Sequence, residues 1–420
     1  MGLSTREAAA PLVGDPAGRW SALCRLAIAM VLAMTTWFSA SAALPQLRTE
    51  WHLSPTAASW LTIAVQLGFV CGALLSATLN LADLIAPRRL ILYGATGAAG
   101  ANLVLLVAGG ASTAIALRFA TGFFLAGVYP PGLKSMATWF RLRRGTALGV
   151  MVGALTLGSA VPHLVNGLGG VRWEVVIVVT SGLTVTGGLV AELAGRDGPF
   201  PFPKAVFDPT QVPRAFADPG VRLATLGYFG HMWELYAMWA WFSVFFADRL
   251  LRDGSDDPFR GAAFATAAAI GVGGVGCIVG GVLGDRWGRT RTAALSMVIS
   301  GGCAVAIGWL HTAPVPLVLA VGLVWGFWVV ADSAQFSAIV TELADQRYVG
   351  TAVTLQLAAG FTLTVVTIWL IPELVELVTW RWAFAVLAAG PLVGVWAMLR
   401  LLRSLSVLGT LLTVDVAQHR

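Results

Sequence analysis

The sequence predicts an all-α membrane protein with twelve transmembrane helices in two six-helix bundles related by pseudo-two-fold symmetry. Three observations support this fold class. Of the 420 residues, 57% are hydrophobic and only 11% are charged, whereas soluble chains carry about 25% charged residues. The apolar residues fall into twelve runs long enough to cross a bilayer. These runs form two sets of six that share short sequence matches in the same order.

Each predicted span is a run of roughly 20 mostly apolar residues, the length that a helix needs to cross the hydrocarbon core. The segment between the two sets, residues 195–220, contains six prolines and cannot continue either neighbouring helix. We therefore expect a first bundle over residues 1–194, a cytoplasmic linker over 195–220 and a second bundle over 221–420. In chain order the runs lie near 21–45, 57–79, 90–110, 112–136, 146–168, 172–194, 221–247, 261–283, 291–311, 314–340, 350–372 and 377–402.

The two sets of spans resemble copies of one six-helix unit. The segment WFSA at 37–40 matches WFSV at 241–244, and LADLIAPRR at 81–89 matches LGDRWGRTR at 283–291. Because both copies enter the membrane from the same side, the repeat predicts parallel halves around an axis along the membrane normal.

The positions of the basic residues predict the orientation. Most of the 27 Lys and Arg residues fall on the side that holds the N-terminus, the linker and the C-terminus. Since basic loops stay in the cytoplasm, we expect a multi-pass protein of a bacterial-type inner (plasma) membrane with both termini cytoplasmic. The basic residues are too scattered for a nucleic-acid interface. The four cysteines lie in apolar runs and are typical of small buried hydrophobic residues rather than disulfide or metal ligands.

Two motifs connect the chain to a known family. The segment GVLGDRWGRTR, residues 281–291, combines glycines, an aspartate and basic residues in a loop between two spans. The segment RFATG, residues 118–122, puts an arginine inside the fourth span. Both are similar to motifs of the major facilitator superfamily, and the resemblance covers nearly the whole chain. Within that family the chain is weakly nearer the bacterial small-anion porters of the nitrate and cyanate type, although it lacks the glycine- and asparagine-rich signature of nitrate porters.

The resemblance implies a cytoplasmic gating loop in each half. In the second half, Asp285 can lie near a helix N-terminus, where a carboxylate is favourable, and can pair with Arg289 or Arg291. The first-half copy is degraded, because Ala86 and Pro87 stand where a glycine and a basic residue are expected, and this puts its function in doubt. The gating-loop residues are Gly281, Asp285, Gly288, Arg289 and Arg291 in the second half, and Asp83, Arg88 and Arg89 in the first.

Polar side chains inside the spans are costly in a bilayer and mark functional sites. His231 and Glu234 lie three positions apart in the seventh span, so a helix places both on one face near the membrane midplane. They either line the transport cavity as proton or substrate groups or form a structural hydrogen-bonded pair. A metal site is the least favoured alternative, because no spacing argument supplies a third ligand. The predicted substrate and proton pathway comprises His231, Glu234, Arg118, Asp332, Gln335, Trp37, Trp241 and Gln66.

Arg118 either ties neighbouring helices together or binds an anionic substrate. Together with His231 it favours a small organic anion, moved by alternating access and coupled to protons. The alternative is proton-coupled efflux of hydrophobic compounds, which a tryptophan-rich cavity would suit. A membrane enzyme or a non-transporting receptor is disfavoured, since the sequence shows no nucleophile with its base. We expect no cofactor and no metal; the expected partners are a small-molecule substrate, protons and lipid, and the expected working unit is a monomer.

Overall fold

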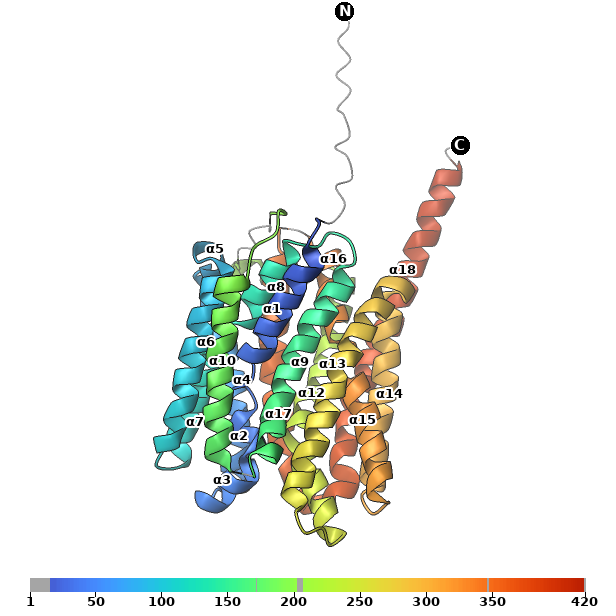
Figure 1. Ribbon diagram of the computed structural model, residues 1–420. Helices are drawn as coiled ribbons and strands as arrows, with labels where there is room; N and C mark the ends of the chain where they lie inside the picture. Colours follow the sequence, from blue (N-terminus) through green and yellow to red (C-terminus); the bar gives the residue numbers. More distant parts are fainter. Residues whose placement is uncertain (1–15, 171, 202–206, 346, 419–420) are drawn as a thin grey trace, which may run out of the picture.

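The structure, a computed structural model, describes residues 16–170, 172–201, 207–345 and 347–418. Every element of secondary structure in these ranges is an α-helix or a 3-10 helix, which confirms the all-α class. Figure 1 shows the blue-to-green helices of the first half grouped on one side of the molecule and the yellow-to-red helices of the second half on the other. The start of α1 and the end of α18 lie at the same end. The termini themselves, residues 1–15 and 419–420, lie outside the described residues.

The first half contains ten α-helices and one 3-10 helix. Long helices alternate with short ones that continue or connect them. In chain order they are α1 (Arg19–Ala33), α2 (Ser39–Ala42), α3 (Leu44–Glu50), α4 (Pro55–Thr78), α5 (Leu81–Leu84), α6 (Pro87–Leu103), η1 (Val104–Val107), α7 (Ala111–Leu125), α8 (Tyr129–Ala137), α9 (Arg144–Leu168) and α10 (Trp173–Ala194).

The linker and the second half follow, with residues 202–206 of the predicted linker outside the described ranges. The elements are η2 (Pro209–Gln211), α11 (Val212–Ala215), α12 (Pro219–Arg252), α13 (Pro258–Trp287), α14 (Arg289–Trp309), α15 (Val315–Ala331), α16 (Ser333–Leu343), α17 (Val349–Ala383), η3 (Phe384–Ala388) and α18 (Ala389–Gln418). Thr379, with φ 60° and ψ 175°, breaks α17. This break lies close to the predicted boundary between the last two spans.

Local sequence signals fix where the long helices begin. Ser54, Asp218 and Asp257 each accept a hydrogen bond from a backbone N–H of the first turn, and each is followed by proline. A polar N-cap and a proline at the first helical position both favour helix initiation. Helices α4, α12 and α13 therefore start at positions that the sequence itself marks.

Nine segments of the described chain are long and apolar enough to cross a membrane. One of them, residues Val349–Ser404, contains both of the predicted last two spans. Helix α12 carries His231 and Glu234 and is not among the nine, and neither is the interrupted first span. A multi-pass helical membrane protein is therefore supported, while the count of twelve crossings stays a prediction.

The first span departs from the expected continuous run. Helix α1 ends at Ala33, and the chain turns through residues 34–38 before α2 begins. The carbonyls of Thr36 and Trp37 in this turn accept hydrogen bonds from Arg118 of α7. A distant arginine thus takes acceptors that a continuous helix would use internally.

The two halves meet mainly along two helix pairs, α9 with α13 and α4 with α17. Glycines let the first pair approach closely: a Cβ at Gly149 would lie 2.5 Å from the carbonyl oxygen of Cys277, and one at Gly153 would lie 2.8 Å from that of Gly274. We call the contact surface between the two halves the seam.

The expectation for the cysteines was partly wrong, because Cys24 and Cys71 are exposed on the outside of the helices.

Candidate functional site

His231 of α12 contacts the point where α15 gives way to α16. Its Nδ1 lies 2.8 Å from Oδ1 of Asp332, and its Nε2 lies 2.6 Å from Oγ of Ser333. Asp332 sits between the last residue of α15 and the first residue of α16. The side chains of His231 and Asp332 are each only 2% exposed. An imidazole beside a carboxylate can hold a proton in a buried place, because the two charges compensate each other.

Glu234 has a separate set of partners. Its Oε1 accepts a hydrogen bond from the indole Nε1 of Trp325 at 2.7 Å, and its Oε2 accepts one from Oγ of Ser300 at 2.8 Å. These partners lie on α15 and α14, in the second half. His231 and Glu234 therefore bind different groups rather than each other, which does not fit the alternative of a mutual hydrogen-bonded pair. Within the described ranges no cluster of His, Cys, Asp or Glu could hold a metal ion.

Three other predicted pathway residues take different roles. Gln335 donates from Nε2 to the carbonyl oxygen of Gly280 at 3.1 Å and so ties α16 to α13. Trp241 donates from Nε1 to the carbonyl oxygen of Ile368 at 2.9 Å and ties α12 to α17. Gln66 is fully buried on α4, and among the described residues neither atom of its amide group has a hydrogen-bond partner.

Arg118 is fully buried and ties four parts of the first half together. Its hydrogen bonds in the described part of the chain all go to uncharged groups. Two of the acceptors are carbonyls just past the end of α1, where the negative end of the helix dipole partly compensates the guanidinium. The acceptors are the carbonyl oxygens of Thr36 (3.0 Å), Leu61 (3.4 Å) and Trp37, Oγ of Ser39 (3.0 Å) and Oδ1 of Asn102 (3.1 Å).

Aromatic side chains from both halves interlock at the seam, beside the turn that Arg118 holds. Ring centroids lie 4.9 Å apart for Trp37 and Phe69, 5.7 Å for Trp37 and Phe361, and 5.2 Å for Tyr236 and Phe361. These separations are within the range of favourable aromatic pairs. The seam cluster, as we call it, consists of Trp37, Phe38, Phe69, Tyr236, Trp239 and Phe361.

Asp285, at the end of α13, caps the start of α9 in the other half. Its carboxylate accepts hydrogen bonds from the backbone N–H of Gly145 (3.1 Å) and from both the N–H and the hydroxyl of Thr146 (2.8 Å each). The residue before α9, Arg143, has φ 52° and makes no side-chain cap of its own. A carboxylate at a helix N-terminus is stabilised by the exposed N–H groups and the helix dipole.

The other second-half loop residues surround this cap. Arg289 lies 3.8 Å from Asp285 and binds Glu342 of α16 at 2.7 Å, whereas Arg291 is exposed. Gly288 adopts φ 102°, a conformation that favours glycine. Gly281 packs so close to α9 that a Cβ would lie 2.5 Å from the carbonyl oxygen of Gly145.

The first-half loop makes contacts within its own half. Asp83 pairs with Lys134 of α8. Arg88 and Arg89 lie 3.8 Å and 3.9 Å from Glu192 of α10. The two copies of the motif therefore differ in what they join: Asp285 of the intact copy hydrogen-bonds across the seam, whereas Asp83, Arg88 and Arg89 of the degraded copy pair with groups of their own half.

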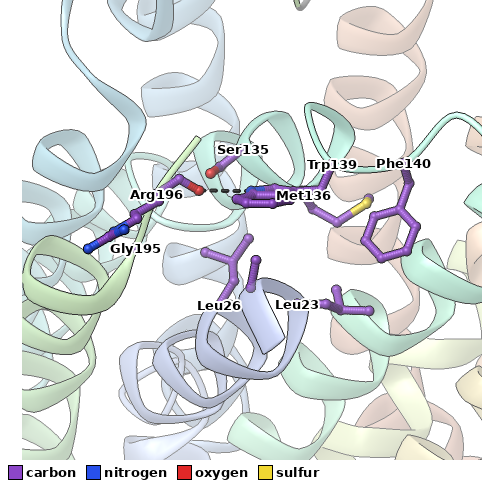
Figure 2. A pocket seen from close by; sticks show the side chains of 9 residues that line it. Leu23, Leu26, Ser135, Met136, Trp139, Phe140, Gly195 and Arg196 are labelled. Atoms are coloured by element: carbon purple, nitrogen blue, oxygen red, sulfur yellow. Dashed lines mark hydrogen bonds between the residues drawn. The ribbon is translucent and has the colours of Figure 1, made fainter. Parts of the chain in front are cut away.

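A small hollow lies apart from these groups, at the end of the first half. It is lined by residues of α1 and α8 and the chain after α10, and the indole of Trp139 donates to the carbonyl oxygen of Arg196 at 2.9 Å beside it (Figure 2). Its lining contains none of the predicted pathway residues. The hollow is therefore separate from the residues of the candidate site.

Comparisons with known proteins agree with this architecture. The sequence matches the family model of the Major Facilitator Superfamily over residues 26–327. The chain belongs to the major facilitator superfamily. A bacterial homologue of the human lysosomal transporter Spinster, in an inward-facing and unoccupied conformation, has the same fold with a TM-score of 0.63 and 15% identity, over 92% of this chain and 96% of that chain. The nucleoside transporter NupG gives a TM-score of 0.68 and 13% identity, over 90% of this chain and 99% of that chain. Curated protein sequences give no match.

Membership of the superfamily makes this chain a membrane transporter rather than an enzyme. The all-α membrane class and the family predicted from the sequence are thus confirmed, while the twelve helices in two pseudo-symmetric bundles stay a prediction. The nearer likeness to nitrate and cyanate porters stays a prediction, and so do the roles of the site residues.

Several partners in this superfamily member were not foreseen. Asn102 bonds Arg118 and Ser300 bonds Glu234; an amide or hydroxyl inside an apolar run is a signal that could have pointed to them. The seam residues Phe69 and Phe361 gave no such signal, because a phenylalanine in a span faces lipid or protein equally well.

Proposed function

We propose that this superfamily member is a secondary transporter that moves a small organic anion by alternating access, coupled to protons. In this proposal twelve crossings form two six-helix bundles, residues 1–194 and 221–420, related by a pseudo-two-fold axis and joined by the linker at 195–220. The working unit is a monomer. It lies in a bacterial-type inner (plasma) membrane with both chain ends in the cytoplasm.

The observation that carries the proposal is the separation of buried charge between the halves. In the first half, Arg118 is buried among uncharged acceptors. In the second half, His231, Asp332 and Glu234 are buried together with their polar partners. A buried cation without a carboxylate partner favours an anion in its field. Histidine is the side chain that exchanges a proton near neutral pH.

A chain of contacts can carry a change of protonation from this site to the seam. Asp332 lies at the N-terminal end of α16, where its negative charge interacts favourably with the helix. Helix α16 is bound to α13 by Gln335, and α13 carries Asp285, which caps α9 in the other half. Protonation of the His231–Asp332 pair alters the interaction of Asp332 with the start of α16. The contacts of Gln335 and Asp285 then connect this change to the opening of the seam.

The test is uptake of a panel of radiolabelled small anions into proteoliposomes, with and without an imposed pH gradient. We expect the gradient to drive uptake of at least one anion by the wild-type protein. Asp332→Asn should abolish the effect of the gradient while exchange of the same anion across the membrane continues. Asp256→Asn, in an exposed loop, is the matched control and should behave as wild type. A pH dependence unchanged in both Asp332→Asn and Glu234→Gln would contradict the coupling.

The seam cluster favours a second candidate, proton-coupled efflux of hydrophobic compounds. An aromatic surface binds apolar molecules without needing a charge on them. No uptake of any anion in the panel, together with dye extrusion from cells that express the protein, would support this candidate and overturn the first.

A further inference from the structure

Two hydrogen-bond donors in the seam cluster have no acceptor among the described residues. Trp37 and Trp239 are 1% and 0% exposed, and within the described ranges neither indole Nε1 has a hydrogen-bond partner. Three other tryptophans of the second half do have acceptors: Trp241 bonds Ile368, Trp233 bonds Val386 and Trp325 bonds Glu234. Burying a donor without an acceptor is costly. The two unpartnered donors therefore point to a ligand that is bound at the seam.

Two other unpartnered polar groups lie on helices of the first half that pass the cluster. Gln66 lies one helical turn from Phe69 on α4, and its amide is unpartnered among the described residues. His163 of α9 is 1% exposed, and both of its ring nitrogens are unpartnered in the same ranges. It lies one turn before Asn166, which donates to the carbonyl oxygen of Ala42 at 2.7 Å. Along the helix axes, His163 therefore lies near α2, the short helix that follows the turn carrying Trp37.

The chemistry of these groups selects the ligand. An indole N–H is a donor only, so Trp37 and Trp239 require an acceptor. The guanidinium of Arg118, which binds the carbonyl oxygens of Thr36 and Trp37, adds positive potential directly behind that turn. A carboxylate meets both requirements. The neighbouring side chains of the cluster are the aromatic rings of Phe69, Tyr236 and Phe361, which suit contact with a planar ring.

We propose that the substrate is a small aromatic monocarboxylate whose carboxylate accepts hydrogen bonds from the indole N–H groups of Trp37 and Trp239. Its ring replaces part of the ring-to-ring contacts of the seam cluster. Gln66 and His163 bind polar substituents on the ring. This inference rests on the proposed transport of organic anions and names the class of anion.

The test is binding of radiolabelled benzoate to the purified full chain in detergent, which avoids the leak of benzoic acid through lipid. Wild type should bind benzoate. Benzamide, which has the same shape without the charge, and acetate, which lacks the ring, should compete poorly. Trp37→Phe and Trp239→Phe keep a ring and lose the donor, and each should weaken binding about tenfold or more. Trp60→Phe, on the outer surface of α4 at 38% exposure, is the matched control and should bind as wild type.

Each part of the proposal has a result that overturns it. If benzamide competes as well as benzoate, the protein does not recognise the carboxylate. If acetate competes as well as benzoate, the protein does not recognise the ring. Unchanged binding in both tryptophan variants would show that the two indole N–H groups do not bind the carboxylate. If the wild type does not bind benzoate, aromatic monocarboxylates are not the substrate class. If a tryptophan variant does not fold, Phe69→Leu replaces it, because it removes a ring and keeps both donors; it too should weaken binding, and unchanged binding would count against the proposal. Gradient-driven uptake of non-aromatic anions alongside a failed benzoate test would overturn this inference and leave the proposed function standing.

Discussion

One carboxylate, Asp285, makes a polar contact across one end of the seam, and under the proposed transport its removal should shift the balance between the closed and open conformations of that end. It accepts three hydrogen bonds from Gly145 and Thr146 of the other half. A hydrogen bond to a charged group contributes about 1.5–3 kcal/mol, and the helix dipole adds about 0.3–1 kcal/mol. The Asp285 side chain is 20% exposed, and solvent reduces these contributions. We expect Asp285→Ala to cost the closed state about 2–3 kcal/mol, a roughly 30- to 150-fold change in the closed-to-open ratio.

Electron-spin distance measurements between the halves can detect this shift. Spin labels at Leu84 of α5 and Trp287 of α13, both exposed, would be placed in a variant without the four natural cysteines. Wild type should give mainly the short distance, and Asp285→Ala should add a long one. Asp83→Ala is the matched control, because Asp83 pairs with Lys134 inside its own half. An unchanged distribution for Asp285→Ala, or an equal shift for Asp83→Ala, would refute the reasoning.

Three further outcomes can be measured. Arg118→Lys removes the guanidinium fork and should cost about 2–4 kcal/mol of stability; a Tm equal to wild type in detergent would contradict this. Gly281→Ala puts a Cβ 2.5 Å from the Gly145 carbonyl oxygen and should lower the fraction of molecules that give the short distance in the spin-label assay. Gly302→Ala, with no atom within 4 Å of its Cβ, should leave that fraction unchanged. Burial lowers the pKa of His311, in the loop after α14, from its ordinary 6.5. Below about pH 6.5 the His311 side chain takes up a proton in the unfolded chain more readily than in the folded chain, so protonation favours unfolding. The wild-type Tm should therefore fall from about pH 7 to about pH 5, and His311→Gln should fall less.

The fold class could be predicted because it depends on bulk properties. A bilayer requires long apolar runs whatever their neighbours are, and composition alone excludes a soluble protein. The break after Ala33 could not be predicted in this way. Its local sequence is as apolar as a helix interior, and the carbonyls of Thr36 and Trp37 bind Arg118, which lies 82 and 81 positions away. Contacts at that separation depend on how helices pack, which the run lengths do not contain.

In the candidate site, too, the sequence indicates which residues are unusual, whereas their contacts depend on helix packing. His231, Glu234, Asp332 and Arg118 stand out because ionisable groups are rare inside spans. Spacing on one helix says which residues share a face, but it does not say which neighbouring helix that face meets. The sequence therefore grouped His231 with Glu234, while packing gives one of them Asp332 and the other Trp325 and Ser300.

The repeat predicted from the sequence is also less informative about contacts than about topology. Trp37 and Trp241 occupy matching positions in the two halves. Trp241 donates to the carbonyl oxygen of Ile368 inside the second half, whereas Trp37 lies in the seam cluster and its indole N–H has no acceptor among the described residues. Matching positions in a duplicated unit meet different surroundings once the two copies face each other.

Helix α9 is held at both ends by α13, and the two links match the polarity of the helix. Asp285 places a carboxylate at the N-terminus of α9, and Arg260 donates from Nε to the carbonyl oxygen of Gly167, near its C-terminus, at 3.1 Å. A helix dipole favours a negative group at the first end and a positive group at the second. Between the links the two backbones approach closely through glycines, such as Gly153 facing Gly274. If the transporter works by the proposed alternating access, we expect the opening of one end to break one polar link while the other remains as a pivot.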